Sequence, residues 1–240
     1  MATTKGSRSP RYVGIAADIR ERILSRQLGP HALLPSEREL SEKYGVSRMT
    51  ARQALTVLES EGHVYRRPPR GTFVAEPRVR FHIGSFTQEA TRLGHQAHAQ
   101  LLWAKKAPPD PQARTALELP EDGLVHAFRR LRLMEEEPIA LETTYFPADL
   151  TPGIIDKADD GSLWALLEDE YGVALDRSDA VLESIILDEE SCNRLKIRAA
   201  SPGILLTRRT YDANGRCVEY ARDVYRADRA AFEVSATLAR

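Results

Sequence analysis

The chain has 240 residues, of which 42% are hydrophobic and 29% charged, so it fits one large or two modest globular domains and is neither disordered nor fibrous. It contains no apolar run long enough to span a membrane, and its first residues lack the apolar segment of a secretory signal. Its two cysteines have no CxxC spacing, which argues against a zinc module or a disulfide framework, and we expect a cytoplasmic protein without a membrane partner.

The net charge of −1 conceals an uneven distribution along the chain. Residues 1–78 carry 14 Lys and Arg against 8 Asp and Glu, whereas residues 79–240 carry 20 against 27. Residues 1–78 thus form a basic head of charge +6, and residues 79–240 an acidic body of charge −7. This asymmetry indicates that the head binds a polyanion and that the body has a different function.

The head begins with a polar tail over residues 1–10, which we expect to be flexible, and continues with a helix. The apolar residues of this helix recur on one face, at Tyr12, Ile15, Ala16, Ile19 and Ile23. A second helix follows Ser36, which forms a capping box with Glu39 three residues later. Gly45 stands where the end of that helix needs a positive φ.

A third helix starts after a short turn, with Ser47 as its N-cap residue. Its apolar face consists of Ala51, Ala54, Leu55 and Leu58. Two short helices joined by a glycine-containing turn are typical of a helix-turn-helix. Residues 63–75 add two short β-prone runs around a Pro-Pro-Arg-Gly turn, so residues 11–75 are predicted to form a winged helix-turn-helix.

Basic, hydroxyl and glycine residues gather where this motif meets a DNA duplex: Arg38, Ser47, Arg48, Thr50, Arg52, Arg70 and Gly71. Arg48 and Arg52 are one helical turn apart, so both can face the major groove, where arginine binds guanine through two hydrogen bonds. Hydroxyl groups and helix-terminal N–H groups suit phosphates. The alternative is that these arginines are solvated surface charges, but four of them converge on one motif.

The stretch "LPSERELSEKYGVSRMTARQALTVLESEGHVYRRPPRGTFV" resembles the winged helix-turn-helix of GntR-family bacterial transcription regulators. The resemblance implies that the chain binds double-stranded operator DNA. The DNA-contacting positions of the family correspond here to Arg38, Ser47, Arg48, Thr50, Arg52 and Gly71. Pro68 and Pro69 depart from the basic or glycine residues that are more common before the wing tip.

Residues 76–82 lack periodicity and are predicted to be a linker, which leaves residues 83–240 as the body. A helix is expected from Ser85 to Gly94 and another from Ser162 to Gly172. Alternating runs on either side of "EEEP" and of Ala213-Asn214-Gly215 predict two β-hairpins. Hairpins interrupted by helices indicate an α+β domain around an antiparallel sheet.

Polar residues of the body suit a phosphorylated sugar as a set. Arg130 and Arg132 lie on one strand face about 7 Å apart, and paired arginines bind phosphate. The helix starts at Ser85–Thr87 and Ser162 add hydroxyls and free N–H groups. Residues that can bind sugar hydroxyls lie on other strands: Glu142, Glu219 and Tyr225. The alternative is that the two arginines simply pair with Glu142 or with surface acids.

The body also resembles the UTRA effector-binding domain of the HutC subfamily, through "GSFTQEATRLG", "RRLRLMEEEPIALETTYFP" and "RRTYDANGRCVEYARDVYRAD". UTRA domains are similar to the chorismate lyase fold and bind small effectors without processing them. In phosphosugar-sensing members the phosphate-binding positions correspond to Thr87, Arg130, Arg132 and Ser162, and the sugar-contacting ones to Glu142, Glu219 and Tyr225. Trp164 stands where those members often have a tyrosine, which removes a hydroxyl and adds bulk.

The resemblance implies a homodimeric repressor that binds a near-palindromic operator and is released by a small effector. A phosphorylated sugar or amino sugar is favoured, and a non-sugar acid is the alternative. We expect the effector to act through the linker at 76–82 and so to change the distance between the two heads. Two rival functions are a lyase-like enzyme using Glu142, Glu219 or Tyr225 and an effector-free DNA-packing protein. No catalytic residue, metal site or cofactor is predicted, and His95 and His98 are expected to be surface residues.

Overall fold

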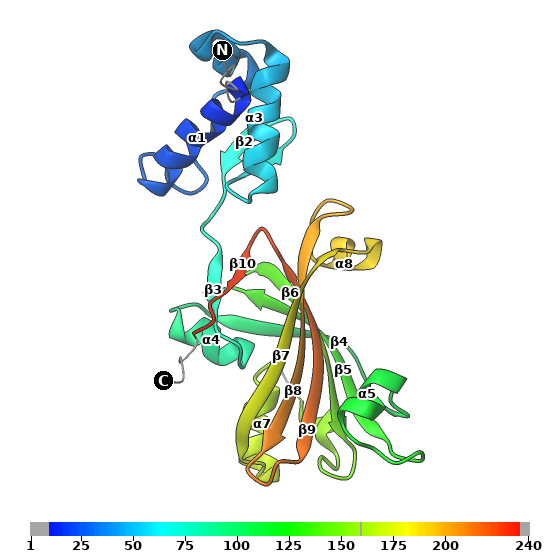
Figure 1. The fold of residues 1–240 in the computed structure, drawn as a ribbon. Helices are drawn as coiled ribbons and strands as arrows, with labels where there is room; N and C mark the ends of the chain where they lie inside the picture. The colour runs from blue at the N-terminus through cyan, green and yellow to red at the C-terminus, as the bar shows by residue number, and fades with distance from the viewer. Residues whose placement is uncertain (1–9, 159, 236–240) are drawn as a thin grey trace, which may run out of the picture. The chain divides into compact units, whose positions relative to one another are not determined.

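The computed structural model describes residues 10–158 and 160–235 and divides into two compact units between Arg78 and Val79 (Figure 1). The predicted flexible tail over 1–10 falls outside the described residues except for Pro10, which precedes the first helix. The elements of the first unit are α1 (Arg11–Leu24), α2 (Glu37–Tyr44), α3 (Arg48–Ser60), β1 (Val64–Arg67) and β2 (Gly71–Val74).

The helices of the first unit pack around one apolar core, as their spacing predicts. The buried residues come from all three helices and both strands: Ile15, Ala16, Ile19, Leu34, Leu40, Ala51, Ala54, Leu55, Leu58, Val64 and Val74. Both halves of the capping box between Ser36 and Glu39 are present, and Gly45 ends α2 at φ 59°. The local signals of the sequence therefore place the first two helices of the motif correctly.

The wing is an antiparallel hairpin in which Val64 pairs with Val74 and Arg67 with Gly71. Gly71 is required there for two reasons. Its φ of +123° is unfavourable for residues with a side chain, and an added Cβ would lie 2.8 Å from Leu33 Cδ1. Gly71 therefore allows the wing to pack closely against Leu33 of the same unit.

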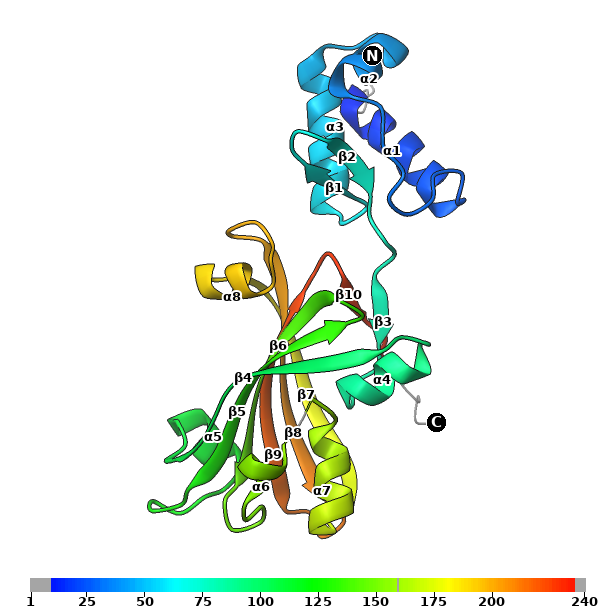
Figure 2. The ribbon, with the colours of Figure 1, turned by 180° about the vertical axis from the view of Figure 1, so that it is seen from behind.

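The second unit is built on a six-stranded antiparallel sheet in the order β4-β5-β6-β9-β8-β7 (Figures 1 and 2). Its strands are β4 (Ala97–Ala107), β5 (Val125–Met134), β6 (Glu137–Pro147), β7 (Leu175–Ile186), β8 (Pro202–Asp212) and β9 (Cys217–Arg226). Its helices are α4 (Phe86–Arg92), α5 (Pro111–Ala116), α6 (Ile154–Lys157), α7 (Leu163–Tyr171) and α8 (Glu189–Arg194). The fold is therefore the α+β arrangement that the hairpins predict.

The predicted linker is wrong over its second half. Residues 79–81 form a short strand, β3 (Val79–Phe81), which pairs in parallel with β10 (Ala230–Phe232). Phe81 is only 1% exposed and packs its ring against Phe86 and Tyr225. A three-residue strand has too few side chains to show a periodicity. The sequence around β3 therefore gives no signal for its pairing with β10, which lies about 150 residues later in the chain.

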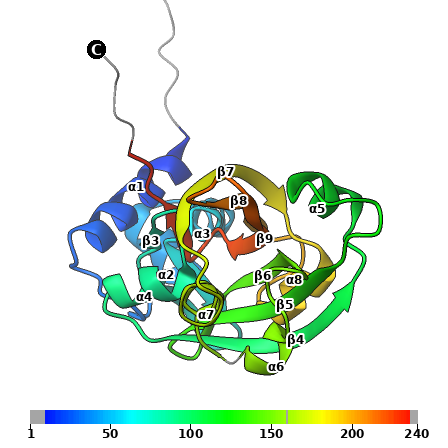
Figure 3. The ribbon, with the colours of Figure 1, turned by 90° about the horizontal axis from the view of Figure 1, so that it is seen from below.

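The two faces of the sheet are covered by different helices (Figure 3). On one face α4 and α7 pack against β5 and β9, whereas α5 and α8 pack against the opposite face. Residues opposite one another on neighbouring strands point to the same face, and the register pairs Arg130 with Glu142 and Glu142 with Asp223. The α4/α7 face therefore carries the charged side chains that the sequence analysis selected.

Candidate functional site

In the first unit the start of α3 is exposed and well capped. The Ser47 hydroxyl accepts a hydrogen bond from the Thr50 N–H, and the two hydroxyl groups lie 2.9 Å apart. Arg48 is exposed at the first position of the helix, while Ala51 and Leu55 are buried. The helix thus directs an arginine outward at the end that enters a major groove in this motif.

Arg52 is held by α2. Its Nε and Nη2 atoms donate to the Glu37 carboxylate at 3.0 and 2.9 Å, and these hydrogen bonds lower the pKa of Glu37. The Arg52 side chain remains 55% exposed, so the pair orients the guanidinium without removing it from solvent. Arg38 makes a looser contact with Glu42, at 3.4 Å.

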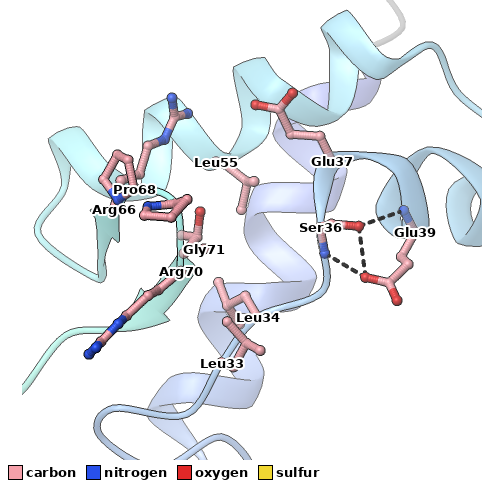
Figure 4. A pocket seen from close by; sticks show the side chains of 12 residues that line it. Leu33, Leu34, Ser36, Glu37, Glu39, Leu55, Arg66, Pro68, Arg70 and Gly71 are labelled. Atoms are coloured by element: carbon pink, nitrogen blue, oxygen red, sulfur yellow. Dashed lines mark hydrogen bonds between the residues drawn. The ribbon is translucent and has the colours of Figure 1, made fainter.

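A groove of about 450 Å³ separates the start of α2 from the wing (Figure 4). Ser36 and Glu37 line it on the α2 side, Arg70 and Gly71 line it on the wing side, and the buried Leu55 of α3 lies between them. The groove thus joins all three parts of the motif on one surface. Of the predicted DNA-contacting residues, Arg70 and Gly71 line the groove, and Arg52 pairs with Glu37, which lines it on the α2 side.

In the second unit, Arg130 and Arg132 share one carboxylate on the α4/α7 face. Arg130 Nη2 lies 2.6 Å and Arg132 Nη1 3.3 Å from Glu142 Oε2, and the three side chains are buried. Both arginines therefore pair with Glu142, as the alternative in the sequence analysis expected. The pairing nevertheless leaves two guanidinium groups on a single carboxylate.

A second charged pair lies on strands β8 and β9. Arg208 Nε and Nη2 each lie 3.2 Å from an oxygen of Glu219. Glu219 also accepts hydrogen bonds from the Thr210 hydroxyl at 2.6 Å and from Trp164 Nε1 at 3.0 Å. The Arg208 guanidinium lies over the Trp164 ring, 4.8 Å from its centroid. Trp164 therefore contacts both members of this pair, Glu219 through its N–H group and Arg208 through its ring.

The arginines also hold the starts of the two helices that cover this face. Arg130 Nη1 donates to the Gly161 carbonyl and Arg208 Nη1 to the Gly84 carbonyl, both at 2.9 Å. Each glycine directly precedes an N-cap serine, and the hydroxyls of Ser85 and Ser162 lie 3.2 Å apart. Both helix starts thus meet above the charged cluster.

The acids of the cluster respond differently to burial. Burial raises the pKa of a carboxyl, but Arg130 and Arg132 outweigh this at Glu142 and lower its pKa to about 2. At Asp223 burial dominates, because the nearest guanidinium atom, on Arg208, is 3.9 Å away, and the pKa rises to about 8. The arginines therefore favour the ionised form of Glu142, whereas burial favours the protonated form of its cross-strand neighbour Asp223.

Comparison with known proteins gives both units a family. Residues 11–74 match the bacterial regulatory proteins of the gntR family, and residues 92–231 match the UTRA domain. The chain is 32% identical to the HTH-type transcriptional repressor NagR of Bacillus subtilis over 97% of each chain. It is 31% identical to the mannosyl-D-glycerate transport/metabolism system repressor MngR of Escherichia coli, over 91% of this chain and 92% of that one. The crystal structure of PhnF from Mycobacterium smegmatis matches with a TM-score of 0.66 at 29% identity, covering 93% of this chain and 99% of that one.

The chain belongs to the GntR family. Its UTRA domain assigns it to the HutC subfamily, and it is a ligand-responsive transcriptional repressor. The enzyme hypothesis is wrong, since the matching families and the relatives named above are transcription regulators. GntR regulators bind DNA and small-molecule effectors, which are the two partners predicted for the head and the body.

The structure of this regulator brings most of the selected body residues together on the α4/α7 face. They fall into three sets of contacts: Thr87, Arg130, Arg132 and Glu142; Trp164 and Glu219; and Ser85 with Ser162. In the first set Thr87 accepts a hydrogen bond of 2.7 Å from Arg132 Nη2. Tyr225 lies on the same face but packs its ring among the aromatic residues Phe81, Phe86 and Phe232.

Two buried residues of the same face were not selected from the sequence, Arg208 and Asp223. Each follows the alternation of its strand, because Arg208 is two residues from Thr210 and Asp223 two residues from Tyr225. The signal was therefore present, but it becomes visible only when β8 and β9 are known to be neighbours. In the first unit, Met49 was also passed over, although it is 66% exposed at the start of α3.

The described residues hold no group of three or more His, Cys, Asp and Glu side chains arranged to bind a metal ion. His95 and His98 are both exposed. No helix between residues 10 and 158 or 160 and 235 has the length and apolar character needed to cross a membrane.

Proposed function

We propose that this regulator is a cytoplasmic homodimer that represses transcription at a near-palindromic operator and is released when its UTRA domain binds a phosphorylated sugar, with an amino-sugar phosphate favoured. The observation that carries the effector class is the buried cluster of three arginines beneath two helix starts. The proposed domains are a DNA-binding head at 11–75 and an effector-binding and dimerisation domain over 83–240, to which the pairing of β3 with β10 adds residues from Val79.

The charge balance of the cluster supports an anionic effector. Three guanidinium groups face the carboxylates of Glu142 and Glu219, and burial raises the pKa of Asp223, so this third acid compensates little of their charge. An uncompensated positive charge in a buried site is unfavourable and favours the binding of an anion. Phosphate suits adjacent guanidinium groups because it accepts several charge-assisted hydrogen bonds at once.

The carboxylates and the aromatic ring beside the arginines support a sugar as the rest of the effector. Glu219 and Tyr225 line the same sheet face as the arginines, and carboxylates accept hydrogen bonds from sugar hydroxyls. The relative MngR is named for a system that transports or metabolises mannosyl-D-glycerate, a sugar derivative with an acid group. A non-sugar acid remains the second candidate, because Trp164 adds apolar bulk at the end of the site.

DNA binding by the head is proposed to use the residues around its groove. These are Arg38, Ser47, Arg48, Thr50, Arg52, Arg70 and Gly71. Arg48 points outward at the start of α3 and is assigned to base recognition, whereas Arg70 at the wing is assigned to phosphate contact. The pairing of Arg52 with Glu37 orients its guanidinium before DNA arrives.

Arg208 provides a route from the effector site to the segment that leads to the head. Its hydrogen bond to the Gly84 carbonyl ties the cluster to the short segment between β3 and α4. An anion that draws Arg208 away from this carbonyl alters the chain around 76–84 and thereby the distance between the two heads of the dimer. Such an effector shifts DNA affinity because it binds one arrangement of the dimer better than the other.

Thermal unfolding against a panel of ligands tests the effector class. The panel contains sugar phosphates, the same sugars without phosphate, and non-sugar acids. A ligand at 100 times its Kd stabilises the protein by about 2.7 kcal/mol, a shift that such a measurement detects. Stabilisation by a sugar phosphate but not by its free sugar supports the proposal, whereas stabilisation by a non-sugar acid alone selects the second candidate.

The allosteric part has its own measurement. The distance between spin labels on the two heads of the dimer is compared with and without the stabilising ligand. The same distance distribution in both states contradicts a mechanism through the segment at 76–84.

A further inference from the structure

Three buried polar atoms on the α4/α7 face have no hydrogen-bond partner within residues 10–158 and 160–235. They are Arg132 Nε, Thr144 Oγ1 and Asp223 Oδ1. Asp223 stands opposite Glu142 on the neighbouring strand, Thr144 is two residues from Glu142 on β6, and Arg132 is two residues from Arg130 on β5. All three side chains therefore lie on the sheet face that carries Glu142.

Unpartnered buried polar atoms are uncommon in native proteins, because each has lost its hydrogen bonds to water without gaining others. Most other polar atoms of the cluster are already engaged. Arg208 donates to Glu219 and Gly84, and Glu219 accepts from Arg208, Thr210 and Trp164. The three unpartnered atoms are thus the ones that a bound molecule satisfies without breaking a bond of the protein.

Their chemistry describes the molecule. Arg132 Nε is a charged donor that suits an anionic oxygen. The Thr144 hydroxyl both donates and accepts, and the Asp223 carboxyl oxygen accepts from a hydroxyl or an ammonium group. An anion that also bears hydrogen-bond donors matches all three, whereas a bare anion matches only the arginine.

We propose that Asp223 and Thr144 contact the hydroxyl-bearing or amino-bearing part of the effector, while Arg132 Nε binds its anionic group, so that Asp223 and Thr144 determine specificity. This assignment rests on the proposed function of the α4/α7 face as the effector site. The raised pKa of Asp223 agrees with it, because a carboxyl held in its neutral form both donates to a ligand and accepts from it.

Binding of two probes to four variants tests the assignment. The probes are glucosamine 6-phosphate, which has an anion and several donors, and inorganic phosphate, which lacks the sugar. We expect T144V and D223A to weaken glucosamine 6-phosphate binding about tenfold each and to leave stabilisation by phosphate unchanged. R132A is expected to weaken both probes, because it removes the site of the anion.

T143V is the matched control for T144V. Thr143 is the preceding residue of the same strand, is also buried, points to the opposite face and accepts a hydrogen bond from Arg129. T143V should therefore lower the melting temperature and leave the affinity for glucosamine 6-phosphate unchanged. T144V should instead leave the melting temperature unchanged and weaken the binding of glucosamine 6-phosphate. Its methyl group replaces a hydroxyl that makes no hydrogen bond within the described residues.

The outcomes separate this assignment from the proposed function. Glucosamine 6-phosphate binding that R132A weakens but T144V and D223A leave unchanged overturns the specificity role and keeps the effector site. Wild-type protein that binds neither these probes nor any other sugar phosphate overturns both. A T144V variant that melts well below wild type shows that Thr144 has a structural role instead, and this also overturns the assignment.

Discussion

The two units use arginine in opposite ways. In the head, Arg38, Arg48, Arg52 and Arg70 are exposed, and the carboxylates that touch two of them come from the helix surface. In the body, Arg130, Arg132 and Arg208 are each at most 3% exposed and bind carboxylates on neighbouring strands. An exposed arginine remains available to a large polyanion, whereas a buried one needs a partner at all times.

The exposure of these arginines predicts how strongly ligand binding in each unit depends on salt. The head keeps its charge in solvent, so its affinity for DNA is expected to depend on salt. The body keeps its charge in a region with little water, where one added anion interacts strongly and little screening occurs.

The largest effect is expected from removing the carboxylate that two buried arginines share. Glu142→Gln leaves Arg130 and Arg132 without their acid, and we expect the free energy of unfolding of the body to fall by about 3–5 kcal/mol. The only two tryptophans, Trp103 and Trp164, both lie in the body, so urea unfolding followed by tryptophan fluorescence reports this unit.

Glu37→Gln in the head is the matched comparison, because it breaks an exposed pair with Arg52. Its effect, followed by circular dichroism, is expected to stay below about 1 kcal/mol. Equal losses for the two variants contradict the distinction between buried and exposed charge.

The pH dependence of stability is the next prediction. The pKa of Asp223 is raised to about 8 in the folded protein, so the folded state holds a proton that the unfolded chain releases above its ordinary pKa of 3.8. Stability should therefore fall as the pH rises from about 4 to 8, by up to about 1.4 kcal/mol per pH unit. Asp223→Asn should remove this slope, whereas Asp122→Asn, at an exposed position, should keep it.

Glu142 contributes a pH dependence of stability of the opposite sign. Its folded pKa of about 2 lies below its ordinary value of 4.5, so its contribution to stability is present above pH 4.5 and is lost as the pH falls toward 2. The body is thus expected to be most stable near pH 4 to 5, and a maximum near pH 8 is incompatible with the protonation states assigned to the two acids.

Arg48→Ala tests base recognition by the exposed arginines. We expect a loss of about 1–3 kcal/mol of binding free energy on the operator and a relaxed preference at one base pair. Arg70→Ala should instead weaken binding to all sequences evenly and reduce the salt slope by about one unit. Fluorescence anisotropy with operator and random duplexes distinguishes the two, and equal losses for Arg48→Ala on both duplexes remove Arg48 from base recognition.

A smaller effect than that of Glu142→Gln is expected from the backbone of the wing. Gly71→Ala places a Cβ at a φ of +123° and 2.8 Å from Leu33, so we expect a loss of about 1–2 kcal/mol in the stability of the head. Gly14→Ala is the control, because an added Cβ meets nothing within 4 Å in α1 and alanine favours a helix. It should leave the head as stable as before or slightly more so.

The sequence by itself determined the head almost completely. The capping box at Ser36, the positive φ at Gly45, the N-cap at Ser47 and the apolar faces of the helices all depend on residues a few positions apart, so they are readable without a fold. The helix from Ser162 to Gly172 and the turn at Gly215 were readable in the body for the same reason.

Only the tertiary structure decided which charges of the body meet. The edge strands β4 and β7 are largely exposed and give weak alternation, and β3 pairs with a strand at the far end of the unit. Asp223 enters the cluster because β9 pairs with β6, a strand more than 50 residues away in the chain, and Arg208 enters it because β8 pairs with β9. Periodicity tells which side chains share a face of one strand, but the order of strands in the sheet, which depends on packing over the whole domain, decides which faces combine into a site.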